Sequence, residues 1–275
     1  DFISAGLAAI NGGIVAFAEM PNNPVPPIDD KSLDEKYQLA KKSAVDIILY
    51  AGTSPNTNPL TREVPYKVYI SKSVGNLFFD SYKGLDIFLE NYRGRNISFH
   101  CENPDILRQN TYRLLHEQKR PIEAEVSAVN FALEMIEKYD LVGKICHCST
   151  AEGIEKIYAA KKRGLSVTVE VTPHHLFFDE TMITQSNRKF FQVNPPIRQT
   201  KENRLALIEA LKNGSIDYLA TDHAPHSREE KRQGVSGLTH LDTYGPFTSW
   251  LIKEHGFSVQ DIVRVCSANP AAFFN

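Results

Sequence analysis

Three ionisable residues, Asp222, His223 and His226, stand within five positions in the segment "YLATDHAPHS" (218–227). The apolar start of this segment indicates a strand, and Pro225 stops it because proline lacks the amide hydrogen that a sheet requires. The three side chains are therefore expected where a strand opens into a loop. An unpaired carboxylate is costly to bury, so the cluster is either a solvated turn or a functional site.

Other ionisable residues occupy the same place on different expected strands. His100 ends "ISFH", His147 ends "KICH", and Glu170 lies near the end of "VTVEV". In a parallel α/β barrel the carboxyl ends of the strands converge on one mouth. Histidine and aspartate together are ligands for zinc or a similar divalent ion. A single strand-end histidine is more often a hydrogen-bonded core residue, but two of them with "TDHAPH" predict a metal site.

Lys67 begins the strand "KVYIS" and has two interpretations. The residues alone favour a surface lysine or a structural ion pair. The alternative is a buried amine whose charged form is disfavoured by desolvation. A neutral amine can react with carbon dioxide, and the carbamate has two oxygens that could bridge two metal ions around a hydroxide nucleophile.

Two further segments leave their roles open. "TPHHLFF" (172–178) has adjacent histidines, and adjacent residues rarely share a metal ion. "QVNPPIR" (192–198) is a rigid proline turn that presents Asn194 and Arg198, as a substrate clamp or as a loop brace.

The elements that must position these residues alternate along the chain. Short apolar runs typical of strands fall at 13–19, 45–50, 66–71, 96–101, 144–149, 166–171 and 216–221. Helical patterns fall at 32–44, 83–92, 103–118, 121–139, 151–164 and 202–213, with further helices to the end. This alternation predicts an α/β fold with a parallel sheet covered by helices. Seven strands are one short of a closed barrel, and no G-x-G-x-x-G follows a strand to favour a doubly wound sheet.

The composition is that of an ordinary globular protein, with 42% hydrophobic residues, 23% charged residues and a net charge of −2 in 275 residues. Lysines and arginines are scattered, which argues against nucleic acid as a partner. No apolar run approaches the roughly 20 residues that span a membrane. The cysteines (Cys101, Cys146, Cys148 and Cys266) lack a paired motif, and no signal peptide is evident. We therefore expect reduced thiols and a cytoplasmic location.

Several motifs taken in order resemble dihydroorotases of the cyclic amidohydrolase superfamily. They are "MPNNP", "KVYIS", "FHCEN", "RPIEAE", "ICHCSTAEGI", "VEVTPHHLF", "VNPPIR", "TDHAPHSREEK", "SGLTHLDT" and "NPAAFF", and they run from residue 20 to residue 274. The combination of "DHAPH", "VNPPIR" and "EVTPHHL" is specific.

The resemblance implies a TIM-type (β/α)₈ barrel with two zinc ions. Lys67 resembles the carboxylated bridging lysine, His100 and His147 the ligands of the second metal, and Asp222 the carboxylate on the first. The remaining implied positions are substrate contacts at Asn22, Asn194 and His226, a substrate-covering residue at Ser73, and an extra or supporting ligand at Glu170.

The implied activity is reversible closure of N-carbamoyl-L-aspartate to L-dihydroorotate, a step of de novo pyrimidine synthesis. In the hydrolytic direction a metal-bridging hydroxide attacks the ring amide carbonyl while a metal polarises its oxygen. Asp222 would accept the hydroxide proton and pass it to the leaving nitrogen.

One departure from the family pattern is serious. The family begins its barrel with His-x-His followed by an arginine, and the nine histidines here never form His-x-His. The motif would lie before Asp1, where "DFISAGLAAINGG" looks like the middle of a helix, and the family usually continues past "NPAAFFN" into a small β domain. We therefore expect residues 1–275 to be a single incomplete barrel domain, lacking the first strand and the flanking β domain. Such a chain should bind metal poorly and turn over slowly.

The alternatives are the related cyclic amidohydrolases allantoinase and dihydropyrimidinase, or a non-catalytic subunit that supports aspartate transcarbamoylase. The presence of Lys67, His100, His147 and Asp222 argues against the non-catalytic interpretation. A homodimer also remains open.

Overall fold

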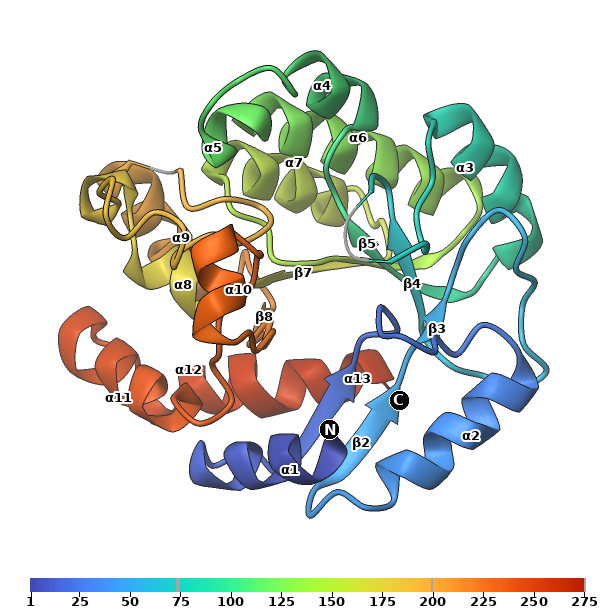
Figure 1. The fold of residues 1–275 in the computed structure, drawn as a ribbon, viewed down its shortest axis with the longest axis horizontal. Coiled ribbons are helices and arrows are strands. Elements are labelled where there is room, and N and C mark those ends of the chain that lie inside the picture. The colour runs from blue at the N-terminus through green and yellow to red at the C-terminus, as the bar shows by residue number, and fades with distance from the viewer. Residues whose placement is uncertain (73–74, 199, 275) are drawn as a thin grey trace.

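The structure is a computed structural model that describes residues 1–72, 75–198 and 200–274 (Figure 1). Its strands are β1 (Ala16–Glu19), β2 (Asp46–Leu49), β3 (Ala51–Gly52), β4 (Tyr66–Tyr69), β5 (Asn96–His100), β6 (Val142–Ile145), β7 (Val167–Val171) and β8 (Tyr218–Leu219). Its α-helices are α1 (Phe2–Asn11), α2 (Asp30–Ala40), α3 (Tyr82–Leu89), α4 (Pro104–Gln109), α5 (His116–Lys119), α6 (Ile122–Lys138), α7 (Ala151–Lys162), α8 (Pro173–Phe177), α9 (Lys201–Asn213), α10 (Arg228–Gln233), α11 (Tyr244–His255), α12 (Val259–Val263) and α13 (Asn269–Phe274). Single turns η1 (Glu90–Tyr92), η2 (Glu180–Met182) and η3 (Arg264–Ala268) complete the described elements.

The strands form a parallel series in chain order. β1 pairs with β2, and β3 to β8 form a second sheet in which each strand pairs with the next. β2 and β3 are one continuous extended segment that changes its partner strand at Tyr50. The Tyr50 amide donates to the carbonyl oxygen of Glu19 in β1, whereas the Ala51 amide donates to that of Pro65, just before β4. The seven strands expected from the sequence are therefore present, with one of them divided. Among the described residues, the series ends at β1 and β8, which do not pair with each other.

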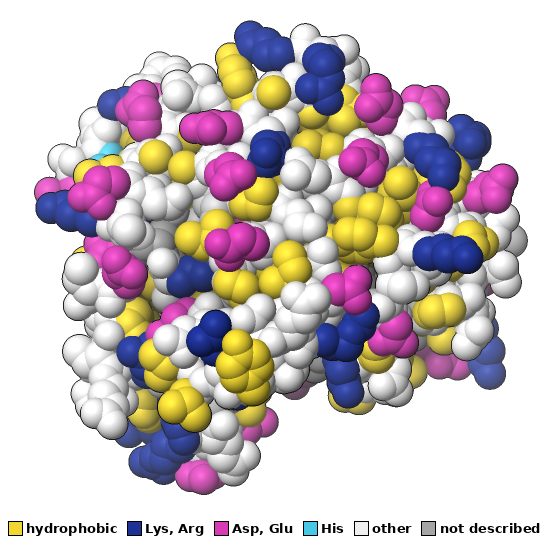
Figure 2. All heavy atoms as spheres, turned by 90° about the horizontal axis from the view of Figure 1, so that it is seen from above, with side chains coloured by type: hydrophobic (Ala, Val, Ile, Leu, Met, Phe, Trp, Pro, Cys, Tyr) yellow, Lys and Arg dark blue, Asp and Glu magenta, His cyan; other side chains and the backbone are white. Residues whose placement is uncertain are grey.

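Helices cover the outer side of this series, and the apolar core fills the space between (Figure 1). α3, α4, α6 and α7 lie on one side of the ring, and α1, α2 and α11–α13 lie opposite. α6 packs closely on β6 because Gly143 has no side chain: a Cβ there would lie 2.2 Å from the Ile136 side chain. On the face shown in Figure 2, lysine and arginine side chains are interspersed with acidic and apolar ones.

Several element bounds differ from the sequence prediction. The helix expected over 103–118 is broken into α4 and α5, because the chain leaves helical geometry at Asn110 and turns through residues 110–115. The strand expected over 144–149 ends at Ile145, because His147 adopts a φ of 36°, which an extended strand cannot contain.

Residues 1–13 are helical, as their pattern suggested: α1 covers Phe2–Asn11, and the Asp1 carboxylate accepts a hydrogen bond from the Ser4 amide at 2.8 Å. The four cysteines are free thiols, as expected. None of the described helices combines the length and the apolar character needed to cross a membrane.

Candidate functional site

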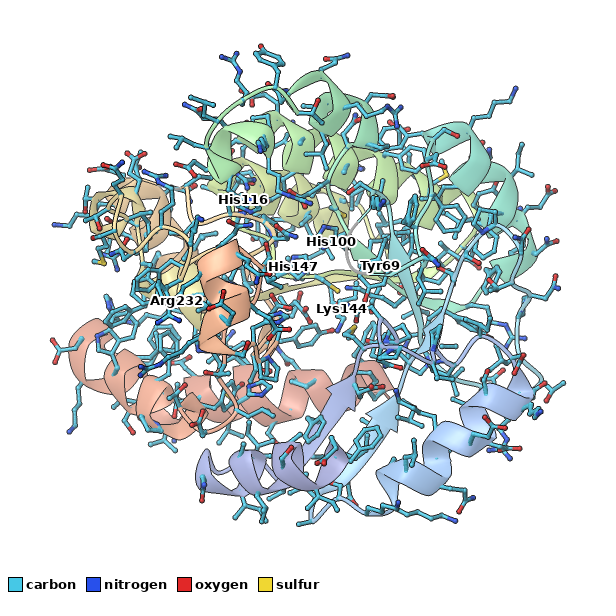
Figure 3. All side chains as sticks on the ribbon, in the orientation of Figure 1. Tyr69, His100, His116, Lys144, His147 and Arg232 are labelled. Atoms are coloured by element: carbon cyan, nitrogen blue, oxygen red, sulfur yellow. The ribbon has the colours of Figure 1, made fainter. Side chains whose placement is uncertain are left out.

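A cavity of about 2090 Å³ brings together side chains from strand ends far apart in the sequence. Figure 3 shows His100, His147, Tyr69 and Lys144 near the centre of the ring of elements. The predicted site residues Asn22, Lys67, His100, His147, Glu170, Asn194, Asp222 and His226 all line this cavity. Ser73, the predicted substrate-covering residue, lies outside the described residues.

The two predicted histidine ligands face each other. His100 ends β5 and His147 follows β6 by two residues, and both are at most 5% exposed. Nδ1 of His100 lies 3.1 Å from Nε2 of His147. Burial lowers the pKa of both imidazoles, which keeps them neutral near pH 7. Neutral imidazole is the form that binds a metal ion.

Glu102 determines which nitrogen of His100 carries the proton. It is fully buried, it lies 2.8 Å from Nε2 of His100, and its other partner is Arg120. Burial opposes ionisation of Glu102, but Arg120 and His100 outweigh it and lower its pKa to about 2. An ionised carboxylate only accepts hydrogen bonds, so the proton of His100 resides on Nε2. Nδ1 is left as the lone-pair nitrogen that points at His147.

The histidine pair fits one metal ion. Tetrahedral zinc with bonds of about 2.05 Å places two of its nitrogen ligands about 3.3 Å apart, close to the 3.1 Å between these two nitrogens. Among the described residues, Nδ1 of His147 has no hydrogen-bond partner, so the imidazole proton can move to Nδ1 and leave Nε2 free to bind a metal ion. In the described ranges, no group of three or more His, Cys, Asp or Glu side chains is arranged to hold a metal ion. A metal ion held by this pair would therefore need a third donor from another group or from a rearrangement.

Lys67 is buried, not at the surface. It is the second residue of β4, it is 3% exposed, and its Nζ lies 2.7 Å from Sγ of Cys146. The surface interpretation that the sequence favoured is therefore wrong. Carboxylation of Lys67 requires a sheltered amine, and this position supplies one; the modification itself stays a prediction.

Glu170 is held by a second buried lysine. Lys144 Nζ lies 2.8 Å from the Glu170 carboxylate and is surrounded by the rings of Tyr50, Tyr218 and Phe273. Burial raises the pKa of Glu170, but Lys144 and Lys67 outweigh it and hold the pKa below its usual value. Glu170 thus lines the cavity as an ion-paired carboxylate.

Asp222 lies three residues beyond β8 in a left-handed conformation, with a φ of 45°. Burial raises its pKa to about 6, although Lys67 opposes the shift. A carboxyl group with a pKa near the working pH can both accept and return a proton. The general base and acid role of Asp222 itself stays a prediction.

Two of the predicted substrate residues, Asn194 and His226, are connected through Ser236. Ser236 Oγ lies 3.3 Å from Oδ1 of Asn194, and Nε2 of His226 lies 3.0 Å from the Ser236 carbonyl oxygen. Sequence reasoning missed Ser236, although "SGLTH" was among the quoted motifs. Arg198 does not line the cavity; it donates to Glu125 at 3.0 Å, so within "VNPPIR" the arginine is the brace and Asn194 faces the site.

The adjacent histidines of "TPHHLFF" do not line the cavity. His175 lies 2.8 Å from the Thr172 hydroxyl and 3.0 Å from the Pro195 carbonyl oxygen, and His174 lies 3.1 Å from His240. These contacts tie the segment after β7 to the proline turn.

Glu125 of α6 organises the segment that follows His147. Its carboxylate accepts from the Ser149 amide at 2.8 Å, the Ser149 hydroxyl at 2.5 Å and the Thr150 hydroxyl at 2.9 Å. Sequence reasoning missed this role, because "RPIEAE" reads as one more amphipathic helix start.

Comparisons with known proteins show which family and fold the chain has. A family model described as "Amidohydrolase family" matches residues 84–275. A dihydroorotase of Thermococcus kodakarensis is 32% identical over 97% of this chain and 62% of its own length. A dihydroorotase of Methanosarcina acetivorans is 32% identical over 100% of this chain and 64% of its own length. The chain thus spans somewhat less than two thirds of the curated relatives that it matches.

Solved structures share the fold. The L-hydantoinase (dihydropyrimidinase) of Arthrobacter aurescens superposes with a TM-score of 0.89 and 26% identity, over 100% of this chain and 66% of that one. A dihydroorotase of Saccharomyces cerevisiae, in complex with 5-fluoroorotic acid, superposes with a TM-score of 0.80 and 17% identity, over 98% of this chain and 79% of that one. The expected barrel class and the resemblance read from the motifs are confirmed.

Proposed function

Because the chain belongs to the amidohydrolase family, we propose that it carries the catalytic barrel of a dihydroorotase. The reaction would be reversible cyclisation of N-carbamoyl-L-aspartate to L-dihydroorotate, with zinc as the metal. The observation that carries the proposal is the facing pair of His100 and His147 in a cavity that Lys67 and Asp222 also line. Pyrimidine synthesis in the cytoplasm is the setting that this activity implies.

The residues that line the cavity would have different roles in the reaction. His100 and His147 would hold the metal through Nδ1 and Nε2, and a carbamate on Lys67 would add oxygen donors. The bound metal supplies a Lewis acid for the amide carbonyl and a hydroxide at neutral pH. Asp222, with its raised pKa, would take a proton from the nucleophile and return it to the leaving nitrogen.

Three other residues that line the cavity would position the substrate. Asn22, Asn194 and His226 line the cavity and offer amide and imidazole groups to a carboxylate or a ring amide. Holding the substrate in the reactive orientation removes an entropic part of the barrier.

A second candidate is dihydropyrimidinase, which the close superposition on the Arthrobacter aurescens enzyme favours. Parallel hydrolysis assays on L-dihydroorotate, dihydrouracil and allantoin separate the candidates. We expect dihydroorotate to be the preferred substrate, with slow turnover by residues 1–275. Preference for dihydrouracil would contradict the dihydroorotase assignment.

Lys67 gives a test that does not depend on turnover. Lys67→Ala should lower the zinc content, because it removes the carbamate oxygens, and a short carboxylate such as propionate should restore part of it. Zinc is measured by atomic absorption after dialysis. Exposed Lys83→Ala is the control and should bind as much zinc as the wild type. An unchanged zinc content in Lys67→Ala would exclude Lys67 as a ligand.

Aspartate transcarbamoylase and a second copy of the chain are proposed partners. If the chain were a non-catalytic subunit, Lys67→Ala and the wild type would show equal zinc content and no turnover, and would bind the transcarbamoylase equally well. Size-exclusion chromatography of each mixture measures the association.

A further inference from the structure

Lys231 of α10 is a buried cation whose observed partners are neutral. It is 7% exposed, and its ammonium group donates to the carbonyl oxygens of Gln192 at 3.0 Å, Val235 at 2.8 Å and Gly237 at 2.8 Å. Across the part of the chain that the structure describes, no carboxylate lies within 4.0 Å of this ammonium group. The adjacent Glu230 is turned away and caps α10 by accepting from the Ser227 amide at 2.7 Å.

The charge of Lys231 is thus partly shielded by carbonyl dipoles but not neutralised. Burial lowers its pKa to about 8, so it is still mostly protonated at neutral pH. The buried His174 is within reach of this charge: burial lowers the pKa of His174 most, His175 and His240 follow, and Lys231 adds to the shift. A buried cation without a counter-ion is costly, and an anion bound nearby would offset that cost.

The three carbonyls belong to segments that border the cavity. Gln192 lies two residues before Asn194, and Val235 and Gly237 flank Ser236. Asn194, Ser236 and Gly237 all line the cavity, on the wall that also carries His226. The ammonium group therefore lies one layer behind this wall and holds its two segments together.

We propose that Lys231 is a positioning residue that makes this wall selective for cyclic amides bearing a carboxylate. The proposal rests on the proposed function only in that the cavity takes a cyclic amide. The fixed positive charge favours the anionic substrate over its neutral counterpart, and the three hydrogen bonds keep Asn194 and Ser236 in place to contact it. A neutral ring of the same shape gains only from the fixed positions of Asn194 and Ser236, not from the charge.

Two pairs of ligands that differ by a carboxylate test this proposal. L-Dihydroorotate is paired with dihydrouracil, and hydantoin-5-acetate with hydantoin, and dissociation constants are measured by calorimetry on the zinc-supplemented chain. Lys231→Met removes the charge and the donors, whereas Lys231→Gln removes the charge but keeps a donor. Arg232→Met is the matched control, because Arg232 is the next residue of α10 and its side chain is 62% exposed (Figure 3).

We expect the wild type and Arg232→Met to bind the carboxylate-bearing member of each pair more tightly. Lys231→Met and Lys231→Gln should reduce that preference about tenfold, chiefly by weakening the anionic member. An equal loss for both members would overturn the proposal and leave Lys231 as a brace alone. No preference for the anion in the wild type would overturn it as well.

The outcome is separable from that of the proposed function. If the chain prefers hydantoin-5-acetate through Lys231 but does not hydrolyse dihydroorotate, the selectivity stands and the dihydroorotase assignment falls. If it hydrolyses dihydroorotate with the same preference in Lys231→Met, the assignment stands and the role of Lys231 falls.

Discussion

A series of buried polar contacts orients one histidine of the candidate metal site. Arg120 is 15% exposed at its side chain and contacts Glu102, which in turn fixes the tautomer of His100. The carboxylate on one side and the metal on the other are the two partners that a ligating histidine commonly has. Because these contacts come from different parts of the chain, only the folded structure reveals Glu102 as their centre.

Replacement of Glu102 by glutamine should weaken metal binding while keeping the shape of the side chain. The amide can donate to Nε2 of His100, which would move the imidazole proton to Nδ1 and block the metal-binding nitrogen. We expect the zinc dissociation constant to rise about 10- to 100-fold, measured by competition with a chromogenic chelator.

Exposed Glu63→Gln removes the same charge from a side chain that is 94% exposed, and it should leave zinc affinity unchanged. Equal zinc affinity in Glu102→Gln and Glu63→Gln would show that the tautomer of His100 does not matter.

Residues that could bind metal or transfer protons were easier to predict from the sequence than the residues that hold them in place. Lys67, His100, His147 and Asp222 stand out because metal ligands come from few residue types, and the structure gathers all four around one cavity. Their metal-binding roles remain predictions. Ser236 and Glu125 could not be found from the sequence, because common polar residues acquire such roles only through contacts made in the fold.

At the scale of elements, α6 sets the path of the chain beyond β6. Glu125 binds the segment through Ser149 and Thr150, directly after His147. His147 itself has a φ of 36°, a conformation that non-glycine residues hold only when their surroundings enforce it. The hydrogen bonds to Glu125 supply part of that enforcement.

Glu125→Gln should therefore destabilise the protein by about 3 kcal/mol, because it breaks a buried charged network that includes the ion pair with Arg198. Urea unfolding followed by circular dichroism measures the loss. Glu134→Gln changes an exposed residue of the same helix and should cost less than about 0.5 kcal/mol. If the two variants unfold at the same urea concentration, the network does not stabilise the fold.

Element types were more predictable than element bounds. Alternating apolar strands and amphipathic helices predicted the parallel arrangement, because each pattern has its own period. The break at Tyr50 and the end of β6 at Ile145 were not predictable, since both depend on the partner strand and on local backbone conformation.

For the whole molecule, buried and half-buried neutral histidines couple stability to pH. Burial lowers the pKa of His116, His175 and His240 to about 4 in each case. The folded-state pKa lies below the unfolded value of 6.5, so between about pH 4 and 6.5 the unfolded chain binds more protons. Stability is therefore complete above pH 6.5 and is lost as the pH falls towards 4.

We expect the urea midpoint to fall markedly between pH 7 and pH 5. His116 donates from Nε2 to the Val193 carbonyl oxygen, a bond that glutamine can replace. His116→Gln should reduce the proton uptake on unfolding at pH 5 by about one, seen as a shallower dependence of stability on pH. A midpoint that does not change with pH would rule out this linkage.

The left-handed backbone at His147 and Asp222 has a consequence for engineering. Glycine would relax both positions, so a search for thermostable variants guided by folding alone would drift towards replacing these two side chains. The cavity would lose an imidazole and a carboxyl group while the scaffold grew more robust. Any stabilisation campaign on this chain should therefore hold residues 147 and 222 fixed from the outset.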